Sequence, residues 1–245
     1  EILARVRARI GSAAALGVRI CASEQRQGGY TLLDMREMIT IIAADGMLYF
    51  FNVDVGHSWG APYVQPSYYE HAQFREVARA IRADVHPTPV LFAGRVNDPV
   101  VAEELLASGV CDLVAMTRAG IADPDFARKA REGRLGEIRR CIGCNRCIGE
   151  SIDQSVPAMF RKPVCSVNPV VGRELEWTAR HRPASECKRV VVVGGGAAGL
   201  EVARVAAGRG HKVVVLERGK ALGGQVNLAA RAPGRDSFAD FRSEE

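Results

Sequence analysis

The hydrophobic residues in roughly the first 135 positions form short continuous apolar runs, which alternate with stretches of helical periodicity. The apolar runs predict buried strands at residues 18–21, 48–53, 89–93 and 113–116. The stretches between them predict helices around residues 34–44, 68–83, 99–107 and 125–132. Apolar strands of this continuous kind are typical of parallel strands covered by helices. The pattern therefore predicts an α/β fold built from four consecutive β/α units.

Four such units correspond either to half of an eight-stranded TIM (β/α)8 barrel or to a small open sheet. A helix-like segment at residues 2–15 precedes the first strand and implies that an earlier strand came before it. This favours the C-terminal half of a barrel. In such barrels the chemistry lies at the C-terminal ends of the strands, and phosphate often binds after the last two.

Two of the predicted strands end in residues suited to phosphate. Gly94-Arg95 follows the third strand and Thr117-Arg118 follows the fourth. Backbone N–H groups and a guanidinium fork at each point could hold a phosphate monoester, although two arginines could also end two strands by chance. His57 follows the second strand and could protonate a substrate or donate to a flavin, or be an ordinary loop histidine.

Four of the seven cysteines suggest a metal centre. Cys141, Cys144 and Cys147 form a C-x2-C-x2-C run, and Cys165 is a distal fourth. This spacing favours an iron–sulfur cluster, because closely spaced thiolates can hold one corner of a cubane and a distant cysteine can complete the ligand set. Structural zinc and free thiols are the alternatives. Clustered cysteines also favour metal ligation in a reducing cytoplasm over disulfides.

A dinucleotide-binding pattern follows the cysteines. The strand at residues 189–193 leads into Gly194-x-Gly196-x-x-Gly199 and a helix at residues 200–208. The next strand ends in Glu217, whose carboxylate would accept a ribose hydroxyl and repel a 2′-phosphate. This predicts FAD, ADP or NAD(H), with a glycine-rich turn that binds nothing as the alternative.

The same pattern continues to Leu222-Gly223-Gly224-Gln225 and Arg235, where small residues would admit more of a dinucleotide. Gln225 and Arg235 could then donate to phosphate or ribose. A polar, proline-containing linker precedes the glycine pattern. The predicted domains are the half barrel at residues 1–140, the cluster segment and linker at 141–187, and the start of a Rossmann-like FAD/NAD(P)-binding domain at 188–245.

Composition excludes several function classes. The 245 residues are 47% hydrophobic and 25% charged, and the net charge of +5 is too mild and scattered to indicate nucleic-acid binding. No stretch approaches the ~20 apolar residues of a membrane span, and no signal peptide opens the chain. We therefore expect a cytoplasmic protein without a membrane partner.

The chain opens inside a helical segment and stops soon after a nucleotide-binding start, so we also expect an internal fragment of a longer protein.

Taken together, the short motifs resemble a known family, in the same order along the chain. The matching motifs are Gly94-Arg95-Val96-Asn97-Asp98-Pro99, Met116-Thr117-Arg118 with Ala122-Asp123, Cys141-Ile142-Gly143-Cys144-Asn145, Asn168-Pro169, Gly194–Gly199 and Gly223-Gly224-Gln225. With these motifs, the chain from about Val18 to Arg235 resembles the 2,4-dienoyl-CoA reductase and trimethylamine dehydrogenase branch of the old yellow enzyme family, a group of NADH:flavin oxidoreductases.

The resemblance implies an FMN-bearing barrel, a 4Fe-4S cluster at its edge and an FAD/NAD(P)-binding module. It also implies that His57 aligns approximately with the family's active-site histidine. By position, the implied FMN contacts are Arg19, Arg95, Thr117 and Arg118, the implied cluster ligands are the four cysteines, and the implied FAD contacts are Ala198, Glu217, Gln225 and Arg235.

The predicted function is an oxidoreductase that passes electrons from NAD(P)H through FAD and a 4Fe-4S cluster to FMN, and then to an activated C=C bond. Its substrate would be an enoyl or dienoyl thioester or an enone. Gln225 resembles these reductases, in which FAD is bound, whereas the amine dehydrogenases keep only ADP. The gap before Cys147 instead resembles the amine dehydrogenases. One alternative is therefore an amine dehydrogenase or demethylase that oxidises an N-methylated amine and passes electrons to a protein carrier.

A second alternative is an inactive fragment or an electron-carrying module, because half a barrel cannot surround FMN without the remainder of the parent chain.

Overall fold

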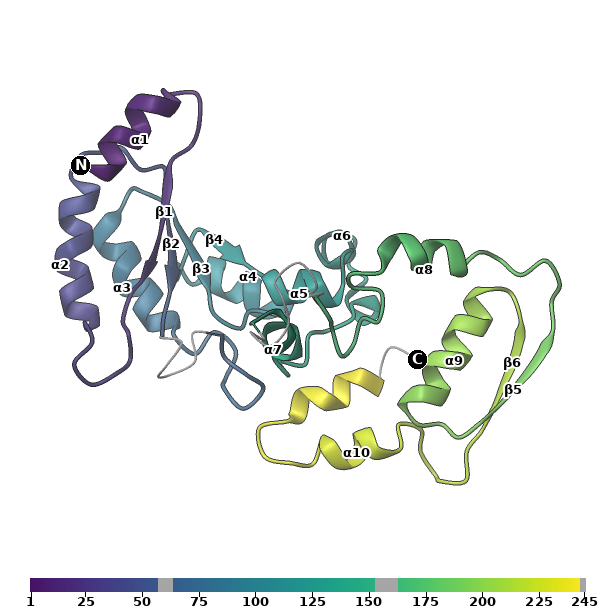
Figure 1. Ribbon diagram of the computed structural model, residues 1–245. Coiled ribbons are helices and arrows are strands. Elements are labelled where there is room, and N and C mark those ends of the chain that lie inside the picture. The colour runs from purple at the N-terminus through teal and green to yellow at the C-terminus, as the bar shows by residue number, and fades with distance from the viewer. Residues whose placement is uncertain (57–63, 153–162, 243–245) are drawn as a thin grey trace. The chain divides into compact units, whose positions relative to one another are not determined.

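The computed structural model describes residues 1–56, 64–152 and 163–242. It contains two compact units, Glu1–Thr117 and Arg118–Glu245 (Figure 1). Within the described residues, no helix combines the length and the apolar character needed to cross a membrane. The three-part domain division predicted from the sequence stays a prediction.

The first unit is built on a parallel sheet of four strands. Their spatial order is β1-β2-β3-β4, the same as their order in the sequence, and every neighbouring pair is parallel. This confirms the predicted α/β fold with four β/α units. The strands are β1 (Gly17–Cys21), β2 (Phe50–Asp54), β3 (Val90–Ala93) and β4 (Leu113–Ala115). The helices of this unit are α1 (Ile2–Ile10), α2 (Leu32–Ala43), α3 (Arg75–Val85) and α4 (Pro99–Ala107).

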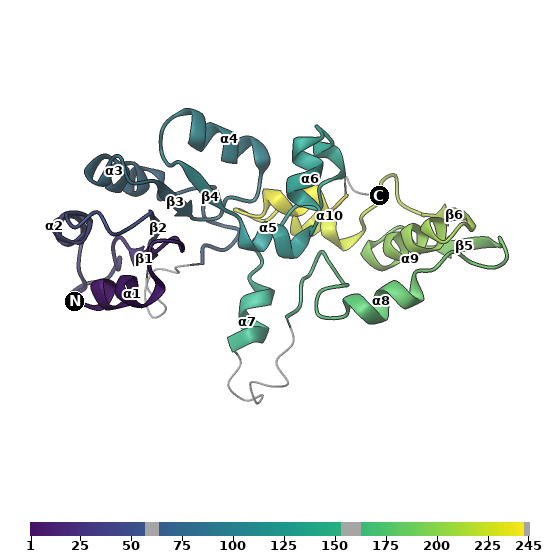
Figure 2. The same ribbon diagram turned by 90° about the horizontal axis from the view of Figure 1, so that it is seen from above.

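Helices cover one face of this sheet. In Figure 2, α2, α3 and α4 form an arc outside the four strands. Phe51 and Val53 of β2 and Val90 and Phe92 of β3 are fully buried in the resulting core. Helix residues that complete this core include Met35, Ile39, Ala78, Ile81 and Leu105, with Phe74 and Val77 packed against it. One face of α3 is therefore apolar and buried against the sheet.

The other face of the sheet carries the alternate residues of each strand. Arg19 pairs in register with Asn52, and Asn52 pairs with Leu91. The Arg19 side chain is 60% exposed and Leu113 of β4 is 49% exposed. Because side chains alternate across a strand, burying one set against the helices leaves this second set on the open face.

Local signals explain where several helices begin and end. Thr31 and Asp34 form a capping box at the start of α2, and Asp98 caps α4, whose first residue is Pro99. The helix predicted at residues 2–15 ends at Ile10, because Gly11 adopts a left-handed conformation with φ of 68°. The helix predicted from residue 68 begins only at Arg75, after a series of turns.

The second unit contains short helices followed by a two-stranded parallel sheet. Strands β5 and β6 pair in parallel from Arg189↔Lys212 to Val193↔Leu216, with α9 between them in sequence. This β-α-β arrangement supports the predicted Rossmann-like start. Its elements are α5 (Thr117–Ala122, which begins in the first unit), α6 (Phe126–Arg131), η1 (Leu135–Glu137), α7 (Arg146–Ile152), α8 (Glu174–Arg180), β5 (Arg189–Val193), α9 (Ala197–Gly208), β6 (Lys212–Leu216), α10 (Gln225–Ala229) and η3 (Asp236–Arg242).

Four of these helices are not predicted by hydrophobic periodicity: α5, α7, α8 and α10. Each spans between five and seven residues. Two turns of helix or fewer give too few positions for a recurring apolar face to be recognised.

Asp112, just before β4, ties three elements of the first unit together. Its carboxylate accepts hydrogen bonds from Arg82 of α3, with Nη2 at 2.8 Å, and from the backbone N–H of Val90 in β3 at 2.9 Å. The Arg82 guanidinium is the main cause of a lowered pKa for Asp112, and the Val90 N–H adds to it. The ionised carboxylate is therefore the form that stabilises the fold.

We expect Asp112→Asn to destabilise the β3–β4 region by about 1 kcal/mol at neutral pH, a modest value because the ion pair is partly exposed. Hydrogen exchange of the peptide covering residues 88–95 in the full-length protein measures this loss. A lowered pKa stabilises the native state above the unfolded-state pKa, and this stabilisation is lost as pH falls through the folded-state pKa. The difference from wild type should therefore shrink in acid.

Asp125→Asn is the matched control, because Asp125 pairs with Arg128 on an exposed surface. Equal exchange rates for wild type and Asp112→Asn at neutral pH would contradict the proposed stabilising role of Asp112.

Candidate functional site

Arg19 is held on the open face of the sheet by a buried carboxylate. Its guanidinium forms an ion pair with Asp54 of β2, which is only 8% exposed. The other oxygen of Asp54, Oδ1, accepts the backbone N–H of Val55 at 2.9 Å. Arg19 thus lies near the C-terminal ends of β1 and β2, the side of a barrel sheet on which ligands bind.

Gly94 and Arg95 follow the end of β3, as predicted. The carbonyl of Gly94 accepts the N–H of Ala72 at 3.1 Å. Arg95 is 8% exposed and adopts a left-handed backbone conformation, and its guanidinium donates to the carbonyl of Tyr69. The described contact of this guanidinium is therefore with the peptide backbone, and its role toward phosphate stays a prediction.

Thr117 and Arg118 follow β4 and open α5. Thr117 is exposed, whereas Arg118 is half-buried and donates from Nη1 to Oδ1 of Asn145 at 2.6 Å. The FMN contact that the family resemblance implies for Arg118 stays a prediction, whereas the structure shows its guanidinium in contact with the cysteine segment. His57 lies outside the described residues.

The four cysteines of the predicted cluster site line one small cavity. Among the described residues, no group of three or more His, Cys, Asp or Glu side chains is arranged to hold a metal ion. A cubane is much larger than a single ion and separates its thiolate ligands more widely. The cavity is lined by Cys141, Cys144, Cys147 and Cys165, together with Arg118, Ile121, Ile142, Asn145, Ser166 and Val167.

The surroundings of the thiols combine burial with groups that favour thiolates. Burial is the main cause of the raised pKa values of Cys141 and Cys147. The Arg118 charge opposes the rise at both cysteines, and at Cys141 the backbone N–H of Gly143, 3.4 Å from Sγ, opposes it as well. A metal ligand must be deprotonated, so positive charge and N–H donors here favour ligation.

Two buried polar residues anchor the cysteine-bearing segments. Asp123 is 4% exposed, and its Oδ2 accepts Nζ of Lys129 at 2.6 Å and the N–H of Arg139 at 2.9 Å. Asn168 is 3% exposed and donates from Nδ2 to the carbonyl of Ile121 at 3.0 Å. Asp123 therefore fixes the chain just before Cys141, and Asn168 fixes the chain just after Cys165.

The glycine pattern between β5 and α9 forms a turn at the N-terminus of α9. Gly196 is the N-cap of α9 and, as a glycine, makes no side-chain hydrogen bond to the first N–H groups of the helix. The first turn contains no acidic residue, and a Cβ at Gly196 would point into open space. The N-terminus of a helix with free N–H groups attracts phosphate. This arrangement fits the predicted role of Gly194, Gly196, Ala198 and Gly199 in holding a dinucleotide.

Glycine is required where the turn closes on the helix. A Cβ at Gly199 would lie 1.9 Å from the carbonyl oxygen of Gly194, closer than any real contact. The predicted second glycine pair lies against the same turn: Gly223 donates its N–H to the carbonyl of Gly195 at 2.7 Å. Gly223 also forms a parallel bridge with Gly196. The segment at Gly223 thus lies directly against the glycine turn at Gly195 and Gly196.

Glu217 lies at this turn, as the sequence predicts. Its carboxylate accepts the N–H of Gly219 at 2.6 Å and the N–H of Gly195 at 2.7 Å. These two donors, in that order, lower the pKa of Glu217. An ionised, exposed carboxylate beside the glycine turn fits the acceptor that a ribose hydroxyl needs.

The remaining predicted nucleotide residues lie further along the chain. Gln225 is exposed and begins α10. The Arg235 guanidinium lies 5.5 Å from the ring centroid of Phe238, and Phe238 packs against the small apolar cluster that contains Ile142 of the cysteine segment. Ser237 donates to the carbonyl of Ile142 at 3.3 Å. Arg235 therefore lies next to a segment that contacts the cysteine site.

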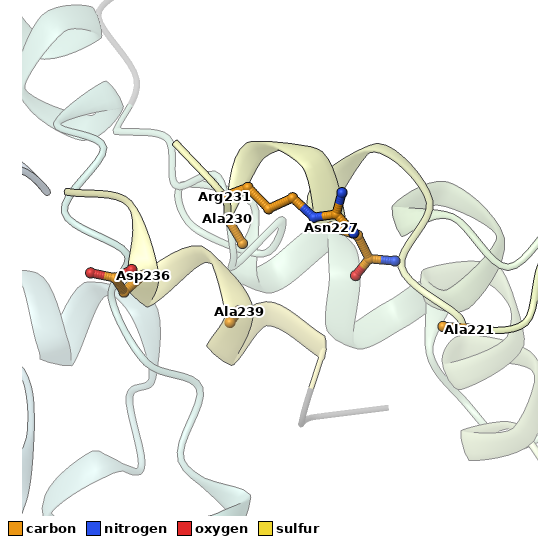
Figure 3. Close-up of a pocket in the computed structure, with 6 residues that line it drawn as sticks. All are labelled: Ala221, Asn227, Ala230, Arg231, Asp236 and Ala239. Atoms are coloured by element: carbon orange, nitrogen blue, oxygen red, sulfur yellow. The ribbon is translucent and has the colours of Figure 1, made fainter. Parts of the chain in front are cut away.

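A cavity of about 370 Å³ lies beside this segment (Figure 3). None of the predicted nucleotide-binding residues is among those that line it. Its lining residues are Ala221, Asn227, Ala230, Arg231, Asp236 and Ala239.

Comparison with known proteins gives the chain its family. Residues 1–137 match the NADH:flavin oxidoreductase / NADH oxidase family. The chain belongs to this family. Residues 151–239 match a second family, pyridine nucleotide-disulphide oxidoreductase. The resemblance to flavin oxidoreductases seen in the sequence is confirmed.

The chain is similar over nearly its whole length to much longer proteins. It is 36% identical to an NADH oxidase of Thermoanaerobacter brockii, covering 99% of this chain and 36% of that protein. It is 39% identical to the N,N-dimethylglycine/sarcosine dehydrogenase of Chromohalobacter salexigens, covering 98% and 34%. A solved structure of 2-naphthoyl-CoA reductase in complex with 2-naphthoyl-CoA superposes with a TM-score of 0.90 at 30% identity, covering 99% and 36%. The chain thus spans about a third of each of these relatives.

Two polar contacts of the site were missed by reasoning from the sequence. The first is Asp54, the partner of Arg19, and the second is Asn145, the partner of Arg118. Asp54 is the last residue of β2, one position after the predicted end of this strand at residue 53, so its place at the C-terminal end of the strand could have been noticed. Asn145 stands between two cysteines, and asparagine tolerates the left-handed backbone conformation. A turn at this position could therefore have been predicted from the sequence.

We expect Gly199→Ala to reduce nucleotide binding, because the new methyl group must push α9 away from the Gly194 carbonyl. Overpacking of this kind costs roughly 1–3 kcal/mol. FAD content after purification and titration with NADH measure the effect in the full-length protein.

Gly208→Ala in the same helix is the control. A Cβ at Gly208 meets no atom within 4 Å, and alanine favours the helix by up to about 1 kcal/mol. Retention of FAD by Gly199→Ala at the level of Gly208→Ala would contradict the steric argument.

Proposed function

We propose that the full-length protein is an NAD(P)H-dependent flavin oxidoreductase that reduces an activated C=C bond in a small-molecule substrate. One observation carries the proposal: four cysteines line a single cavity in the same compact unit as a dinucleotide-type glycine turn. The first half of the chain matches a flavin oxidoreductase family. When bound, FMN would exchange hydride with the substrate, while FAD and a 4Fe-4S cluster would relay electrons between FMN and NAD(P)H.

In this proposal, the strand ends of the first unit hold FMN. Arg19 presents a guanidinium that Asp54 fixes in place, which suits a donor to the flavin ring. Gly94, Arg95 and Thr117 follow β3 and β4, where barrels commonly hold phosphate. His57 would supply a proton to the substrate. Residues 1–140 form the FMN-binding part.

Cys141, Cys144, Cys147 and Cys165 would ligate the 4Fe-4S cluster. The donor set fits this group, because iron–sulfur clusters are held by four thiolates. Burial keeps Cys141 and Cys147 away from water, and the positive charge of Arg118 would partly compensate the negative charge of the thiolates. Residues 141–187 form this part, and residues 188–245 begin the nucleotide-binding domain.

The nucleotide would bind with its phosphates at the start of α9. Gly194, Gly196, Ala198 and Gly199 form the turn that approaches the phosphates, and Glu217 accepts a ribose hydroxyl. Gln225 and Arg235 would donate to the rest of the dinucleotide, which favours FAD over ADP. A carboxylate at residue 217 would repel a 2′-phosphate, so NADPH is not expected at this particular turn.

A second function is favoured by the spacing before Cys147, which resembles that of amine dehydrogenases. In that case an N-methylated amine would be oxidised and electrons would leave through the cysteine site to a protein acceptor. The 39% identity to a dimethylglycine/sarcosine dehydrogenase supports this alternative. The similarity to 2-naphthoyl-CoA reductase supports reduction of a conjugated thioester.

A substrate screen of the full-length protein distinguishes the two directions. We expect NAD(P)H oxidation to accelerate when an enoyl thioester or an enone is added under anaerobic conditions. N-methylated amines with an artificial electron acceptor should give no turnover. Turnover with the amines and none with the conjugated substrates would replace the proposed function by the alternative.

Metal and sulfide analysis tests the cofactors directly. We expect roughly four irons and four sulfides per chain after anaerobic purification, together with flavin. Cys144→Ser should lose the iron and sulfide, because serine does not effectively replace a cysteine thiolate that binds one iron of the cluster, while FAD binding is retained. Cys187→Ser is the matched control, since Cys187 is exposed and outside the cysteine cavity. One zinc without sulfide in the wild type would overturn the cluster assignment.

A further inference from the structure

The chain turns sharply between two of the cysteine ligands, at Asn145. Asn145 has a φ of 56°, in the left-handed region that residues other than glycine rarely adopt. Its carbonyl accepts the N–H groups of Ile148 at 3.0 Å and Gly149 at 3.1 Å, so it opens α7. Cys144 precedes the turn and Cys147 lies in the first turn of α7. The conformation of Asn145 therefore decides whether these two thiols face the same cavity.

The side chain of Asn145 is held by a charged residue from another element. Nη1 of Arg118, in α5, donates to Oδ1 of Asn145 at 2.6 Å. A charged donor at this distance makes a stronger hydrogen bond than a neutral one. The bond joins positions 27 residues apart in sequence, and it ties the left-handed turn to the helix that also carries the buried Ala122.

Both partners face the cavity that the cysteines share. Arg118 and Asn145 line it together with Cys141, Cys144, Cys147 and Cys165. Arg118 therefore places a guanidinium at the wall of the cavity that the four cysteines line. One guanidinium thus contributes both a restraint on the turn and a charge at the cavity wall.

We propose that Arg118 and Asn145 form a positioning pair for the cysteine site: the pair holds the Cys144–Cys147 turn in its ligating conformation, and the Arg118 charge stabilises the anionic centre. The inference rests on the proposed iron–sulfur function. The pair acts through the cysteines, so both members are positioning residues. Because net charge and nearby hydrogen bonds set cluster potentials, the Arg118 charge favours the more negative, reduced state and raises the midpoint potential.

Three substitutions at Asn145 separate the side-chain bond from the backbone turn. Asn145→Ala removes the amide and disfavours the left-handed conformation. Asn145→Gly removes the amide but adopts the conformation freely. Asn145→Asp keeps both an acceptor for Arg118 and tolerance of the turn.

The rate at which the full-length protein loses its visible cluster absorbance to an iron chelator gives the first readout. Residues that orient metal ligands typically change metal affinity by 10- to 100-fold, so we expect Asn145→Ala to lose the cluster on the order of tenfold faster than wild type. Asn145→Gly should be intermediate, and Asn145→Asp should be close to wild type.

The midpoint potential, from a redox titration followed by electron paramagnetic resonance, gives the second readout. Arg118→Gln should lower it, whereas Arg131→Gln, an exposed arginine at the end of α6, should leave it unchanged. A merely structural role of Arg118 would not predict a selective shift in potential.

The outcomes separate this inference from the function on which it rests. Absence of iron and sulfide in the wild type would overturn both. A wild type with a full cluster, in which Asn145→Ala and Asn145→Gly lose iron no faster and Arg118→Gln keeps its potential, would overturn the positioning pair alone. Rapid loss in Asn145→Ala that Asn145→Asp rescues, together with a lowered potential in Arg118→Gln, would support it.

Discussion

Burial of one face of the parallel sheet against the helices is the constraint on which the rest of the first unit depends. Phe51, Val53, Val90 and Phe92 occupy that face and are fully buried. Because strand side chains alternate, this burial necessarily places Arg19 and its neighbours on the opposite face. A guanidinium there would be costly to fix without a partner, and the buried carboxylate of Asp54 provides one. The alternation of side chains along each strand therefore determines both which residues form the core and which charged residues lie on the opposite face.

In the cysteine segment of the second unit, hydrogen bonds of buried polar residues hold the chain in place, whereas apolar packing does so in the first unit. The cysteine segment has few apolar side chains, and its small core contains Ala122, Ile142 and Val167. Asp123 and Asn168 instead satisfy backbone N–H and carbonyl groups on either side of the cysteines. A buried group that satisfies several partners at once is costly to replace, because removing it leaves its partners unsatisfied. Such residues give short, irregular segments a defined shape.

The two candidate sites of the second unit differ in the groups that could compensate a bound negative charge. The cysteine cavity has one guanidinium at its wall, whereas the glycine turn uses the backbone N–H groups of α9 and has no cation among the contacts described for it. Arg118 lies in α5, directly after Thr117. Thr117, which is proposed to contact FMN, and Arg118, which contacts the cysteine segment, are therefore adjacent in the chain.

Hydrophobic patterning and motif spacing by themselves determined the order of β/α units, the four strands to within two residues, the glycine turn with its acidic strand end, and the set of four cysteines. These features depend on local periodicity or on residue types whose chemistry is specific. The tertiary structure alone decided which groups meet. Arg95 contacts the Tyr69 carbonyl, Arg118 contacts Asn145, and Ser237 contacts Ile142.

These contacts join residues between 26 and 95 positions apart. Side-chain pairing over such separations depends on how the elements pack, which no local pattern contains. The short helices α5 and α7 also depend on distant segments, because helices of so few residues gain most of their stability from tertiary contacts rather than from intrinsic helix propensity. The sequence thus specified the chemical groups, and the packing of distant segments decided which of them share a cavity.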